Sequence, residues 1–517
     1  SNYKSIIKGI THIKNISLLT IEGSGMIGIP GYLKKLFEEI SNNNINIIMI
    51  TQASSEHSIC IAINESDSIN AKKIIDEAFK YEIENSILSP SKIESKLSII
   101  ALVGDNMRDH QGISGKMFSA LGKNNINVKA ISQGSSERNI TAVIKDNDVK
   151  KALNTLHEKF FEKNVKQINL FIIGIGNVGS KLIDQIEKQT DYLTKKLKLK
   201  LRIIAISNSK KMLFDESGLT LSNLKEDIDN GENSNLDEFF KKINKLNLRN
   251  SVFIDNTASS KIAGLYQNFL KNNISVVTCN KIACSDSYSS YIELKKLASK
   301  YDTSFLYETN VGAGLPIIDT LNNLINSGDK INSIQAVLSG SLNYIFNNFN
   351  NSNTFEDVVK EAMDKGFTEP DPKIDLSGID VARKILILAR ESGNKIELND
   401  ITNKSFLPKE SLNTKDNKEF LKSLSENKDH FETILNDAYI KDCKIKYVAE
   451  YKNGKASVGI KNIPKDHDFY NLEGSDNIVL FYTDRYKQQP LIVKGAGAGA
   501  DVTAAGIFAD IIRTSKR

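Results

Sequence analysis

The sequence predicts a protein of mixed α/β and α+β class, built from several domains. Three observations support this prediction: the first 160 or so residues contain an internal repeat, a strand that ends in a glycine-rich turn begins near residue 168, and an acidic loop with two prolines leads into a helix near residue 380. The chain has 517 residues, more than one hydrophobic core usually serves, so roughly three or four domains are expected.

The first 160 residues contain two copies of one pattern, offset by 81 residues, so that Gln52 aligns with Gln133. Each copy reads as strand, glycine turn, amphipathic helix, strand, turn, strand and helix. In the first copy the helix is predicted over 32–40 and the next strand over 46–51. The two glutamines follow a predicted core strand at the same place in each copy, which makes them candidate ligand-binding residues.

The segment that begins near residue 168 is typical of a dinucleotide-binding domain. A strand predicted over 168–173 ends in Gly174-Ile175-Gly176-Asn177-Val178-Gly179, and a helix is predicted over 180–188. Glycines at these positions let the backbone approach a pyrophosphate at the positive end of the helix. The motif alone is weak evidence, but here it follows a strand and opens a helix. Further strands predicted over 201–206, 252–255 and 275–278 alternate with helical segments, which indicates a parallel, doubly wound sheet.

The residues after the second strand of this domain bear on the choice of cofactor. They read Asn208-Ser209-Lys210-Lys211, without the acid that an NAD site usually places near the ribose hydroxyls. Two lysines could pair with a 2′-phosphate, so NADP or NADPH is the predicted cofactor, with NAD as the alternative. Lysines that are simply solvated would explain the same residues.

The third and fourth strands end in polar residues that should border the cofactor crevice. Thr257 and Ser259 follow the third strand, and Cys279, Asn280 and Lys281 follow the fourth. Cys279 could indicate a semialdehyde dehydrogenase with an acyl-enzyme intermediate, but such a thiol needs a base partner, usually His. The six histidines lie outside this domain and outside the acidic loop, so we interpret Cys279 as a packing residue.

The acidic loop and the helix after it are the most informative part of the chain. Two prolines stiffen a loop that carries Glu369, Asp371 and Asp375 to the start of the helix. Asp380 and Lys384 lie four residues apart and therefore share one helical face. A surface ion pair is the usual interpretation of an isolated Asp-x-x-x-Lys. Because this pair follows a rigid acidic loop in a chain with a dinucleotide fingerprint, a catalytic face is predicted.

The composition excludes several classes of function. Hydrophobic residues make up 40% and charged residues 25% of the chain, and the net charge of +5 is spread along its length. Basic residues do not cluster with aromatic ones, so no nucleic-acid partner is expected. The longest apolar runs, such as 170–173, are too short to span a membrane. The four cysteines are scattered, which predicts a reducing, cytoplasmic location and no structural zinc. The chain opens with Ser-Asn and not with Met, so we expect it to be part of a longer polypeptide.

The segment from Gly366 to Lys384, Gly-Phe-Thr-Glu-Pro-Asp-Pro-Lys-Ile-Asp-Leu-Ser-Gly-Ile-Asp-Val-Ala-Arg-Lys, resembles the substrate loop and catalytic helix of homoserine dehydrogenases. The resemblance covers about 168–517 and includes the glycine fingerprint, Val311-Gly-Ala-Gly-Leu-Pro, Leu338-Ser-Gly-Ser-Leu-Asn-Tyr-Ile-Phe and the final Gly-Ala-Gly. It departs from the family at Ile374, where a second aspartate is usual.

This resemblance implies a reaction and the roles of several side chains. The reaction interconverts L-aspartate 4-semialdehyde and L-homoserine with NADPH or NADP. Lys384 and Lys281 would act in catalysis, and Asp380 would orient Lys384 or a water. Glu369 would bind the α-ammonium group of the substrate, and Asp375 and Lys384 would line its pocket.

The resemblance also implies cofactor and cation contacts. A monovalent cation, sodium, would be held by Glu308 and by the backbone at Val311, Ala313 and Gly314, whereas the residues alone predict only a tight turn. The expected cofactor contacts are residues 174–179, Asn208, Ser209, Lys210, Lys211, Thr257, Ser259, Lys281, Gly497 and Gly499.

The repeat resembles the tandem ACT (ferredoxin-like) domains of allosteric aspartate kinases, which bind amino-acid effectors. An ACT pair in front of the dehydrogenase part resembles the bifunctional aspartate kinase–homoserine dehydrogenases, whose kinase domain would precede Ser1. Threonine is therefore the expected effector, bound at Gln52 and Gln133, with lysine or methionine as alternatives. A homo-oligomer, either a dimer or a tetramer, is also expected.

These patterns divide the chain into five parts. They are ACT domains at 1–92 and 93–163, an NADP-binding Rossmann domain at 168–312, a mixed-sheet catalytic and dimerisation domain at 313–490, and a C-terminal segment at 491–517 that returns to the cofactor domain. An alternative is a non-catalytic amino-acid-sensing ACT module fused to a decayed reductase. The intact Glu369, Asp380 and Lys384 argue against decay.

Overall fold

The computed structural model of the chain describes residues 6–24, 31–52, 57–105, 107, 110–133, 138–161 and 165–516. The chain forms two compact units, one of Ser1–Lys166 with Lys245–Arg249, and one of Gln167–Asn244 with Asn250–Arg517. Within the described ranges, no helix is long and apolar enough to cross a membrane.

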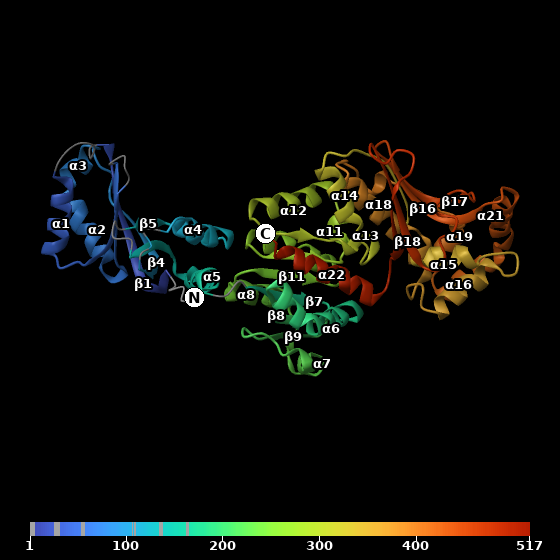
Figure 1. The fold of residues 1–517 in the computed structure, drawn as a ribbon, viewed down its shortest axis with the longest axis horizontal. Coiled ribbons are helices and arrows are strands. Elements are labelled where there is room, and N and C mark those ends of the chain that lie inside the picture. Colours follow the sequence, from blue (N-terminus) through green and yellow to red (C-terminus); the bar gives the residue numbers. More distant parts are fainter. Residues whose placement is uncertain are drawn as a thin grey trace. The chain divides into compact units, whose positions relative to one another are not determined.

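The first unit contains one sheet, which its described residues form from six strands in the order β2-β3-β1-β4-β6-β5 (Figure 1). Its elements are β1 (Ile7–Glu22), α1 (Tyr32–Asn42), β2 (Ile47–Gln52), β3 (Ser58–Asn64), α2 (Ser68–Ala78), α3 (Lys80–Glu84), β4 (Lys92–Gly104), α4 (Ile113–Lys123), β5 (Ala130–Gln133), β6 (Asn139–Lys145) and α5 (Val149–Phe160). The two copies of the repeat thus form one continuous antiparallel sheet.

Two long strands, β1 and β4, are shared by both copies. The second half of β1, from Ile16 on, pairs with β3, whereas its first half pairs with the second half of β4. Ile7 consequently packs in the core of the second copy, with Leu102 and Met117, while Leu19 packs in the core of the first. The start of β1 thus contributes to the core of the second copy, while the division of the repeat at residue 92 stays a prediction.

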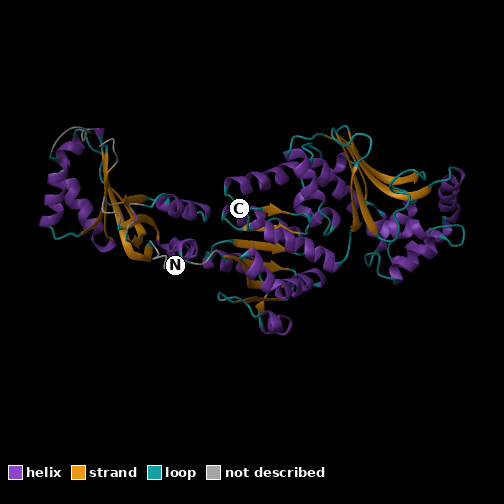
Figure 2. Ribbon diagram, viewed as in Figure 1, coloured by secondary structure: helices purple, strands orange, loops and turns teal. Residues whose placement is uncertain are grey.

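The dinucleotide part of the second unit is a sheet in the order β10-β9-β8-β7-β11-β12-β13, with β7, β11, β12 and β13 parallel (Figure 2). Its elements are β7 (Lys166–Ile173), α6 (Asn177–Tyr192), β8 (Leu199–Ser207), β9 (Lys211–Phe214), α7 (Leu224–Asp227), β10 (Glu232–Asn233), α8 (Leu236–Leu246), β11 (Ser251–Asp255), α9 (Ser260–Ala263), α10 (Tyr266–Lys271), β12 (Ser275–Thr278), α11 (Ile282–Ser285), α12 (Tyr288–Lys300) and β13 (Phe305–Leu306).

The central strands of this sheet are buried on both faces, as the continuous apolar runs predict. On one face Ile254 packs in a core that includes Leu182 of α6. On the other face Phe253 stacks on Phe269 of α10, with ring centroids 3.9 Å apart.

The rest of the second unit contains a mixed sheet in the order β15-β17-β16-β14-β18-β19, and we call it the catalytic part because the sequence analysis predicts the catalytic residues there. β15 runs parallel to β17, and the remaining neighbours are antiparallel. Its elements, with those that lead into and out of the sheet, are α13 (Thr309–Gly312), α14 (Ile317–Asn326), β14 (Ile331–Val337), α15 (Gly340–Asn348), α16 (Phe355–Asp364), α17 (Pro372–Leu376), α18 (Ile379–Glu391), β15 (Thr402–Lys404), α19 (Lys409–Leu412), α20 (Asn417–Glu426), α21 (Lys428–Ile440), β16 (Lys444–Lys452), β17 (Lys455–Ile463), β18 (Asp476–Thr483), β19 (Leu491–Ala496) and α22 (Ala500–Thr514).

The last helix, α22, packs against the first sheet of the second unit. Ala504, Ile507 and Ile511 lie in the same core as Leu182 and Ile186 of α6. Figure 1 shows α22, in red, beside the strands of the dinucleotide part. The end of the chain therefore returns from the catalytic sheet to the dinucleotide part.

Candidate functional site

The acidic loop is held in place by its own carboxylates. α17 begins after Asp371, whose side chain accepts the backbone N–H of Lys373 (3.1 Å), and a proline occupies the first helical position, where no N–H is needed. The carboxylate of Asp375 accepts the backbone N–H of Glu369 (2.8 Å) and the hydroxyl of Ser341 (2.9 Å). Glu369 therefore lies on a fixed loop, and its side chain is exposed.

The turn into α18 requires glycine and sets the direction of that helix. Gly378 has a φ of +72°, and a Cβ there would lie 1.8 Å from the hydroxyl of Tyr447 on β16. Asp380 lies in the first turn of α18, where the positive end of the helix favours a carboxylate. The helix then carries Lys384 one turn further along the same face.

Three charged side chains meet where the dinucleotide and catalytic parts of the second unit join. Lys384 Nζ lies 2.9 Å from Asp380 Oδ2, and Lys281 Nζ lies 3.3 Å from Asp380 Oδ1. Lys384 also donates to the carbonyl of Leu338 at 2.7 Å, and 8% of its surface is exposed. The structure thus brings together the three residues that the sequence analysis assigned to catalysis, and we call them the lysine–aspartate cluster.

Burial and charge have opposite effects on the pKa values of this cluster. Burial alone would raise the pKa of Asp380, but the ammonium groups of Lys384 and Lys281 more than offset it, and the pKa lies below its ordinary value. Burial lowers the pKa of Lys384, and attraction to Asp380 recovers part of that change. Burial likewise raises the pKa of Asp375 in spite of its hydrogen bonds. A lysine with a lowered pKa is suited to proton transfer near neutral pH.

The glycine fingerprint has the geometry that a dinucleotide needs. Gly174 has a φ of +87°, and a Cβ there would lie 2.8 Å from the Thr257 side chain. A Cβ on Gly179 would lie 2.0 Å from the carbonyl oxygen of Gly174, so α6 can approach the turn only with glycine at this position. A Cβ on Gly176 would meet nothing within 4 Å, which leaves space for a ligand at the start of α6.

Asn256, beside this turn, indicates a ligand-binding site, and no sequence motif included it. Its side-chain oxygen and nitrogen are both buried and find no hydrogen-bond partner among the described residues. Its side-chain nitrogen lies 3.2 Å from the place that a Cβ on Gly179 would take. Buried polar groups are normally satisfied, and a polar group of a bound dinucleotide would satisfy this amide. The residues around the turn therefore fit a nicotinamide dinucleotide.

In the turn after β8 one lysine is exposed, and the other forms a hydrogen bond within the protein. Asn208 Oδ1 accepts the backbone N–H groups of Lys210 (2.8 Å) and Lys211 (2.7 Å). The ammonium of Lys211 donates to the carbonyl of Gly231 (3.1 Å), whereas Ser209 and Lys210 are exposed. Lys210 is therefore the more available of the two lysines for a ligand phosphate.

A buried carboxylate organises the polar ends of β11 and β12. Asp255 accepts the backbone N–H (2.8 Å) and hydroxyl (2.7 Å) of Thr257, the hydroxyl of Tyr266 (2.6 Å) and the side-chain N–H of Asn280 (3.0 Å). Burial raises its pKa. Ser259 caps α9, and its carbonyl accepts a second bond from Asn280 (3.0 Å). These bonds fix the segment that leads from β12 into the lysine–aspartate cluster.

Glu308 lies at the predicted cation site and caps a helix there. Its carboxylate accepts the backbone N–H groups of Ile318 (2.6 Å) and Asp319 (2.8 Å) at the start of α14, and Arg513 donates to it at 3.2 Å. Its own N–H donates to Asp510 (3.0 Å). Each oxygen of Glu308 already faces an N–H donor and a guanidinium lies beside it, so these contacts fit an additional cation poorly.

The rest of the predicted cation site is a close turn of backbone. Val311 is buried, Ala313 has a φ of +52°, and a Cβ on Gly314 would lie 2.6 Å from the carbonyl oxygen of Val502. Among the described residues, no group of three or more His, Cys, Asp or Glu side chains could hold a metal ion.

The C-terminal glycines lie close to the lysine–aspartate cluster. A Cβ on Gly497 would lie 2.0 Å from the side chain of Asn477, which donates to the carbonyl of Leu338 at 3.4 Å. That same carbonyl accepts the ammonium of Lys384. Gly499, with a φ of +120°, immediately precedes α22. Asn477 also donates to the carbonyl of Gly497 at 3.5 Å, so the turn at 497–499 is connected to Lys384 through three hydrogen bonds.

The two candidate effector residues occupy equivalent strand ends but differ in their contacts. Gln52 ends β2 and Gln133 ends β5, and both side chains are exposed. Gln133 Oε1 accepts the hydroxyl of Ser114 (3.1 Å). The aligned residue in the first copy is Leu33, which cannot donate such a bond.

Three family profiles match the chain. The profile for "Homoserine dehydrogenase" matches residues 316–512, and that for "Homoserine dehydrogenase, NAD binding domain" matches residues 174–308. The ACT domain profile matches twice, at 19–79 and 100–160.

Similar proteins and structures agree with these profiles. The bifunctional aspartokinase/homoserine dehydrogenase of Haemophilus influenzae is 41% identical over 509 residues, 98% of this chain and 62% of that protein. The homoserine dehydrogenase of Schizosaccharomyces pombe is 36% identical over 357 residues, 67% of this chain and 95% of that protein. A hyperthermophilic archaeal homoserine dehydrogenase, solved in complex with NADPH, is 25% identical with a TM-score of 0.53, and the match covers 68% of this chain and 98% of that one.

The chain spans less than two thirds of the length of the bifunctional relatives that it matches. The S. pombe protein, in contrast, is matched over almost its whole length, and the profiles cover most of the second unit. The chain therefore belongs to the homoserine dehydrogenase family and carries two ACT domains ahead of its dehydrogenase part.

Proposed function

We propose that the second unit catalyses the reversible, NADPH-dependent reduction of L-aspartate 4-semialdehyde to L-homoserine. The observation that carries this proposal is the contact of Lys384 and Lys281 with Asp380, at the junction of the dinucleotide and catalytic parts. The names of the relatives support the reaction class, and the archaeal relative solved with NADPH supports the cofactor.

Reduction of an aldehyde needs a hydride at the carbonyl carbon and a proton at the oxygen. NADPH, when bound, supplies the hydride. Lys384 holds the aldehyde oxygen and donates the proton as negative charge develops there, and Lys281 stabilises the same charge. Asp380 keeps Lys384 charged and oriented, so we regard it as a positioning residue. In the reverse direction Lys384 takes the proton from the homoserine hydroxyl.

The amino-acid end of the substrate is assigned to the acidic loop. Glu369 binds the α-ammonium group, because it presents an exposed carboxylate from a fixed loop. Asp375 lines the pocket and holds the loop, since its oxygens accept bonds from Glu369 and Ser341.

The residues that would hold NADPH surround the glycine fingerprint and the ends of the next strands. We assign them as residues 174–179, Asn208, Ser209, Lys210, Thr257, Ser259, Lys281, Gly497 and Gly499. Preference for NADP over NAD rests on Lys210. Sodium at Glu308, Val311, Ala313 and Gly314 stays a prediction from the resemblance, and the helix-capping contacts of Glu308 favour a structural role for that carboxylate.

We also propose that the ACT pair binds an amino-acid effector, with threonine as the first candidate and with Gln52 and Gln133 as its contacts. The support is the ACT profile in both copies and the equivalent positions of the two glutamines. In this proposal the chain is the regulatory and dehydrogenase portion of a bifunctional aspartokinase, as the names of the longer relatives suggest. A homo-oligomer stays a prediction from the resemblance.

The direct test of the catalytic assignment is Lys384→Ala. Loss of a positioned proton donor typically lowers the rate by about 10²–10⁴-fold, and we expect kcat for semialdehyde reduction to fall in that range. NADPH binding, measured by fluorescence, should change little. Lys360→Ala, an exposed lysine on α16, is the matched control and should keep its activity. A kcat for Lys384→Ala equal to that of the wild type would remove Lys384 from the mechanism.

A further inference from the structure

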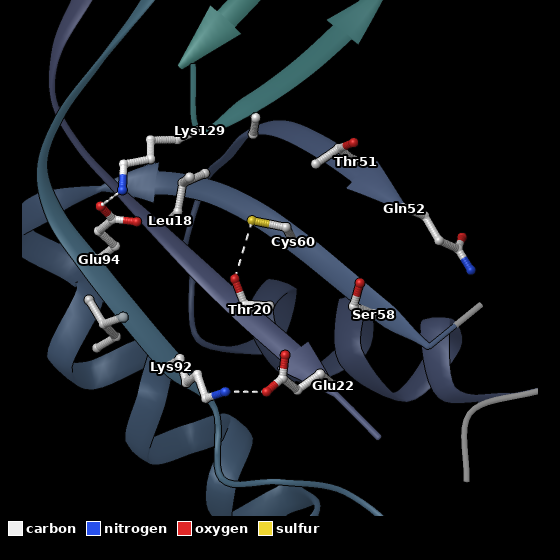
Figure 3. A pocket seen from close by; sticks show the side chains of 12 residues that line it. Leu18, Thr20, Glu22, Thr51, Gln52, Ser58, Cys60, Lys92, Glu94 and Lys129 are labelled. Atoms are coloured by element: carbon white, nitrogen blue, oxygen red, sulfur yellow. Dashed lines mark hydrogen bonds and ion pairs between the residues drawn. The ribbon is translucent and has the colours of Figure 1, made fainter. Parts of the chain in front are cut away.

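A cavity in the first unit and a buried arginine in the second take no part in the catalytic assignments. The cavity, of about 610 Å³, is lined by Gln52 from the first copy of the repeat and by Lys129 from the second (Figure 3). It lies in the ACT pair, for which effector binding is already proposed. The arginine is Arg390, near the end of α18, six residues after Lys384 on the same helix.

Arg390 is almost completely buried, and its guanidinium donates through all three nitrogen atoms. Nη1 donates to the carbonyl of Cys284 (2.8 Å), Nε to the carbonyl of Ile396 (3.0 Å) and Nη2 to the carboxylate of Glu397 (2.8 Å). The exposed fraction of the residue is 3%. Removing a charge from water is costly unless the charge is paired and hydrogen-bonded, so this set of contacts holds the guanidinium in one place.

The bond to Cys284 joins α18 to the short helix that follows Lys281. Lys281 immediately precedes α11, and its carbonyl accepts the backbone N–H (3.0 Å) and the hydroxyl (2.8 Å) of Ser285. Cys284 is therefore less than one helical turn from Lys281, about 4.5 Å along the helix axis. Arg390 consequently bonds to the backbone of the segment that carries Lys281.

The other end of α18 contacts the side chain of Lys281 itself. Asp380, in the first turn, lies 3.3 Å from Lys281 Nζ, and these two side chains are 40% and 30% exposed. Asp380 and Arg390 lie about 15 Å apart along the axis of a rigid helix. The contact at the first turn uses a long, flexible side chain, whereas the contact at the last turn is buried and reaches backbone. The buried contact therefore fixes α11 against α18, and the exposed contact depends on that placement.

The residues around Arg390 attach the same end of α18 to α12. The Glu397 carboxylate, which accepts a bond from Arg390, also accepts the backbone N–H of Tyr288 at the start of α12, at 3.0 Å and 3.1 Å from its two oxygens. Glu391, the last residue of α18, accepts the hydroxyl of Tyr291 on α12. The guanidinium lies over the rings of both tyrosines, 5.8 Å and 5.5 Å from their centroids. The last turn of α18 is thus anchored in the dinucleotide part.

We propose that Arg390 is a positioning residue for the lysine–aspartate cluster. Its bond to the Cys284 carbonyl sets the distance of Lys281 from the rest of the cluster. The inference rests on the proposed function, since it concerns the reaction for which the cluster is assigned. Without this bond Lys281 moves away from Asp380 and Lys384, and the aldehyde oxygen loses one of its two ammonium groups. The rate then falls because less of the developing charge is stabilised.

The same displacement changes the pH dependence of the reaction. The charges that act on Lys384 come from Asp380 on its own helix, Asp375 on α17 and Lys281 before α11. Of these three, Lys281 is the like charge, and it lowers the pKa of Lys384. When Lys281 moves away, the pKa of Lys384 rises, so the alkaline fall in kcat begins at higher pH than in the wild type.

The first test is Arg390→Lys, which keeps the charge but cannot donate in three directions from a planar group. We expect kcat for semialdehyde reduction to fall by about 10- to 100-fold, as displacement of a catalytic group predicts, and its alkaline fall to move to higher pH. KM for NADPH should change little. Arg485→Lys is the control, because Arg485 also donates to a backbone carbonyl, that of Ser327 (2.6 Å), but takes no part in the contacts of α18 described above. It should keep the wild-type rate and pH profile.

A double-variant cycle separates positioning from general support of the fold. In a Lys281→Met background Arg390→Lys should have little further effect on kcat or on the pH profile, because the side chain that it positions is absent. Losses that multiply in the double variant would overturn the positioning role. The thermal transition of each variant is measured alongside. If Arg390→Lys does not fold, Glu397→Gln weakens one of the three bonds and should move the alkaline fall in the same direction, and an unchanged profile would overturn the proposal.

The outcomes distinguish this inference from the proposed function. A wild-type chain that reduces the semialdehyde, together with an Arg390→Lys variant of unchanged kcat and pH profile, would overturn the positioning role and leave the reaction intact. A fall in kcat without a shift of the pH profile would also overturn it and would assign Arg390 to the stability of the fold. A folded wild type that binds NADPH but does not oxidise it with the semialdehyde would overturn both.

Discussion

Replacement of Asp380 by Asn should lower the pKa of Lys384 and shift the pH dependence of semialdehyde reduction. Asn keeps the shape of the side chain but removes a negative charge that lies 2.9 Å from Lys384 and 3.3 Å from Lys281. Burial already lowers the pKa of Lys384, and attraction to Asp380 opposes this effect. In the variant, burial and repulsion from Lys281 act on Lys384 without that opposition.

The magnitude follows from the distance and the exposure of the pair. Two unit charges about 4 Å apart interact by about 4 kcal/mol at an effective dielectric constant of about 20. The side chain of Asp380 is 40% exposed, so water screens this interaction. Taking about half of it gives about 2 kcal/mol, which corresponds to a pKa change of about 1.5 units.

The assay is kcat for NADPH-dependent reduction of aspartate semialdehyde, measured from mildly acidic to alkaline pH. Lys384 must be protonated to donate a proton, so the rate falls as the pH rises through its pKa. In Asp380→Asn we expect that fall to begin about 1.5 pH units lower than in the wild type. Lys281→Met removes a like charge that lowers the pKa of Lys384, so its alkaline fall should begin at higher pH. An unchanged profile in Asp380→Asn, or shifts of the same sign in both variants, would refute the assignment of Lys384 as the proton donor.

Three further predictions concern substrate binding, cofactor choice and stability. Glu369→Gln should raise KM for the semialdehyde more than KM for NADPH, because an amide cannot form an ion pair with the α-ammonium group. Steady-state kinetics measure both constants. An unchanged KM for the semialdehyde would mean that another acid binds the α-ammonium group. Lys210→Ala should reduce the ratio of kcat/KM for NADPH over NADH more than Lys211→Ala does, because Lys211 already donates to a carbonyl, and equal effects would contradict this view. Burial raises the pKa of Asp510 from 3.8 to about 7, so this group stabilises the fold at acidic pH and the contribution is lost as the pH rises through 7. The free energy of unfolding, measured in urea, should therefore fall less in Asp510→Asn than in the wild type between mildly acidic and mildly alkaline pH. Equal losses in the two proteins would contradict this role of Asp510.

The fold class and the family could be predicted from the sequence because their signals are local. The 81-residue offset recurs in the two ranges that the ACT profile matches, and the family prediction is confirmed by the profiles and the relatives. The fourth strand of the dinucleotide sheet, Ser275–Thr278, has its predicted bounds, because it is a short apolar run that ends in polar residues. The helix after the fingerprint begins three residues earlier than predicted, at Asn177, since the glycine turn itself enters the helix.

The features that could not be predicted depend on contacts between distant segments. The sharing of β1 and β4 by the two ACT copies is a matter of long-range strand pairing, which an aligned repeat does not reveal. Asn256 and Asp255 carry no motif of their own, and their importance comes from burial and from the groups around them. The capping role of Glu308 depends likewise on the backbone of α14 and on Arg513 at the end of the chain.

The lysine–aspartate cluster could be predicted from the sequence only in part. The i, i+4 spacing of Asp380 and Lys384 is visible in the sequence, and the structure gives the 2.9 Å contact that it implies. The approach of Lys281 from another sheet follows from the resemblance and not from spacing. The role of the Leu338 carbonyl, which fixes the ammonium of Lys384, follows from the structure alone.

The most direct test of the central claim is the oxidation of NADPH by the purified chain in the presence of L-aspartate 4-semialdehyde, followed by the loss of nicotinamide absorbance. We expect turnover with the wild type, formation of L-homoserine in equal amount to the NADPH consumed, and the reverse reaction with L-homoserine and NADP. Lys384→Ala should bind NADPH and turn over at a small fraction of this rate. A folded wild-type chain that binds NADPH but does not oxidise it with the semialdehyde would contradict the claim and would favour an amino-acid-sensing module with an inactive reductase.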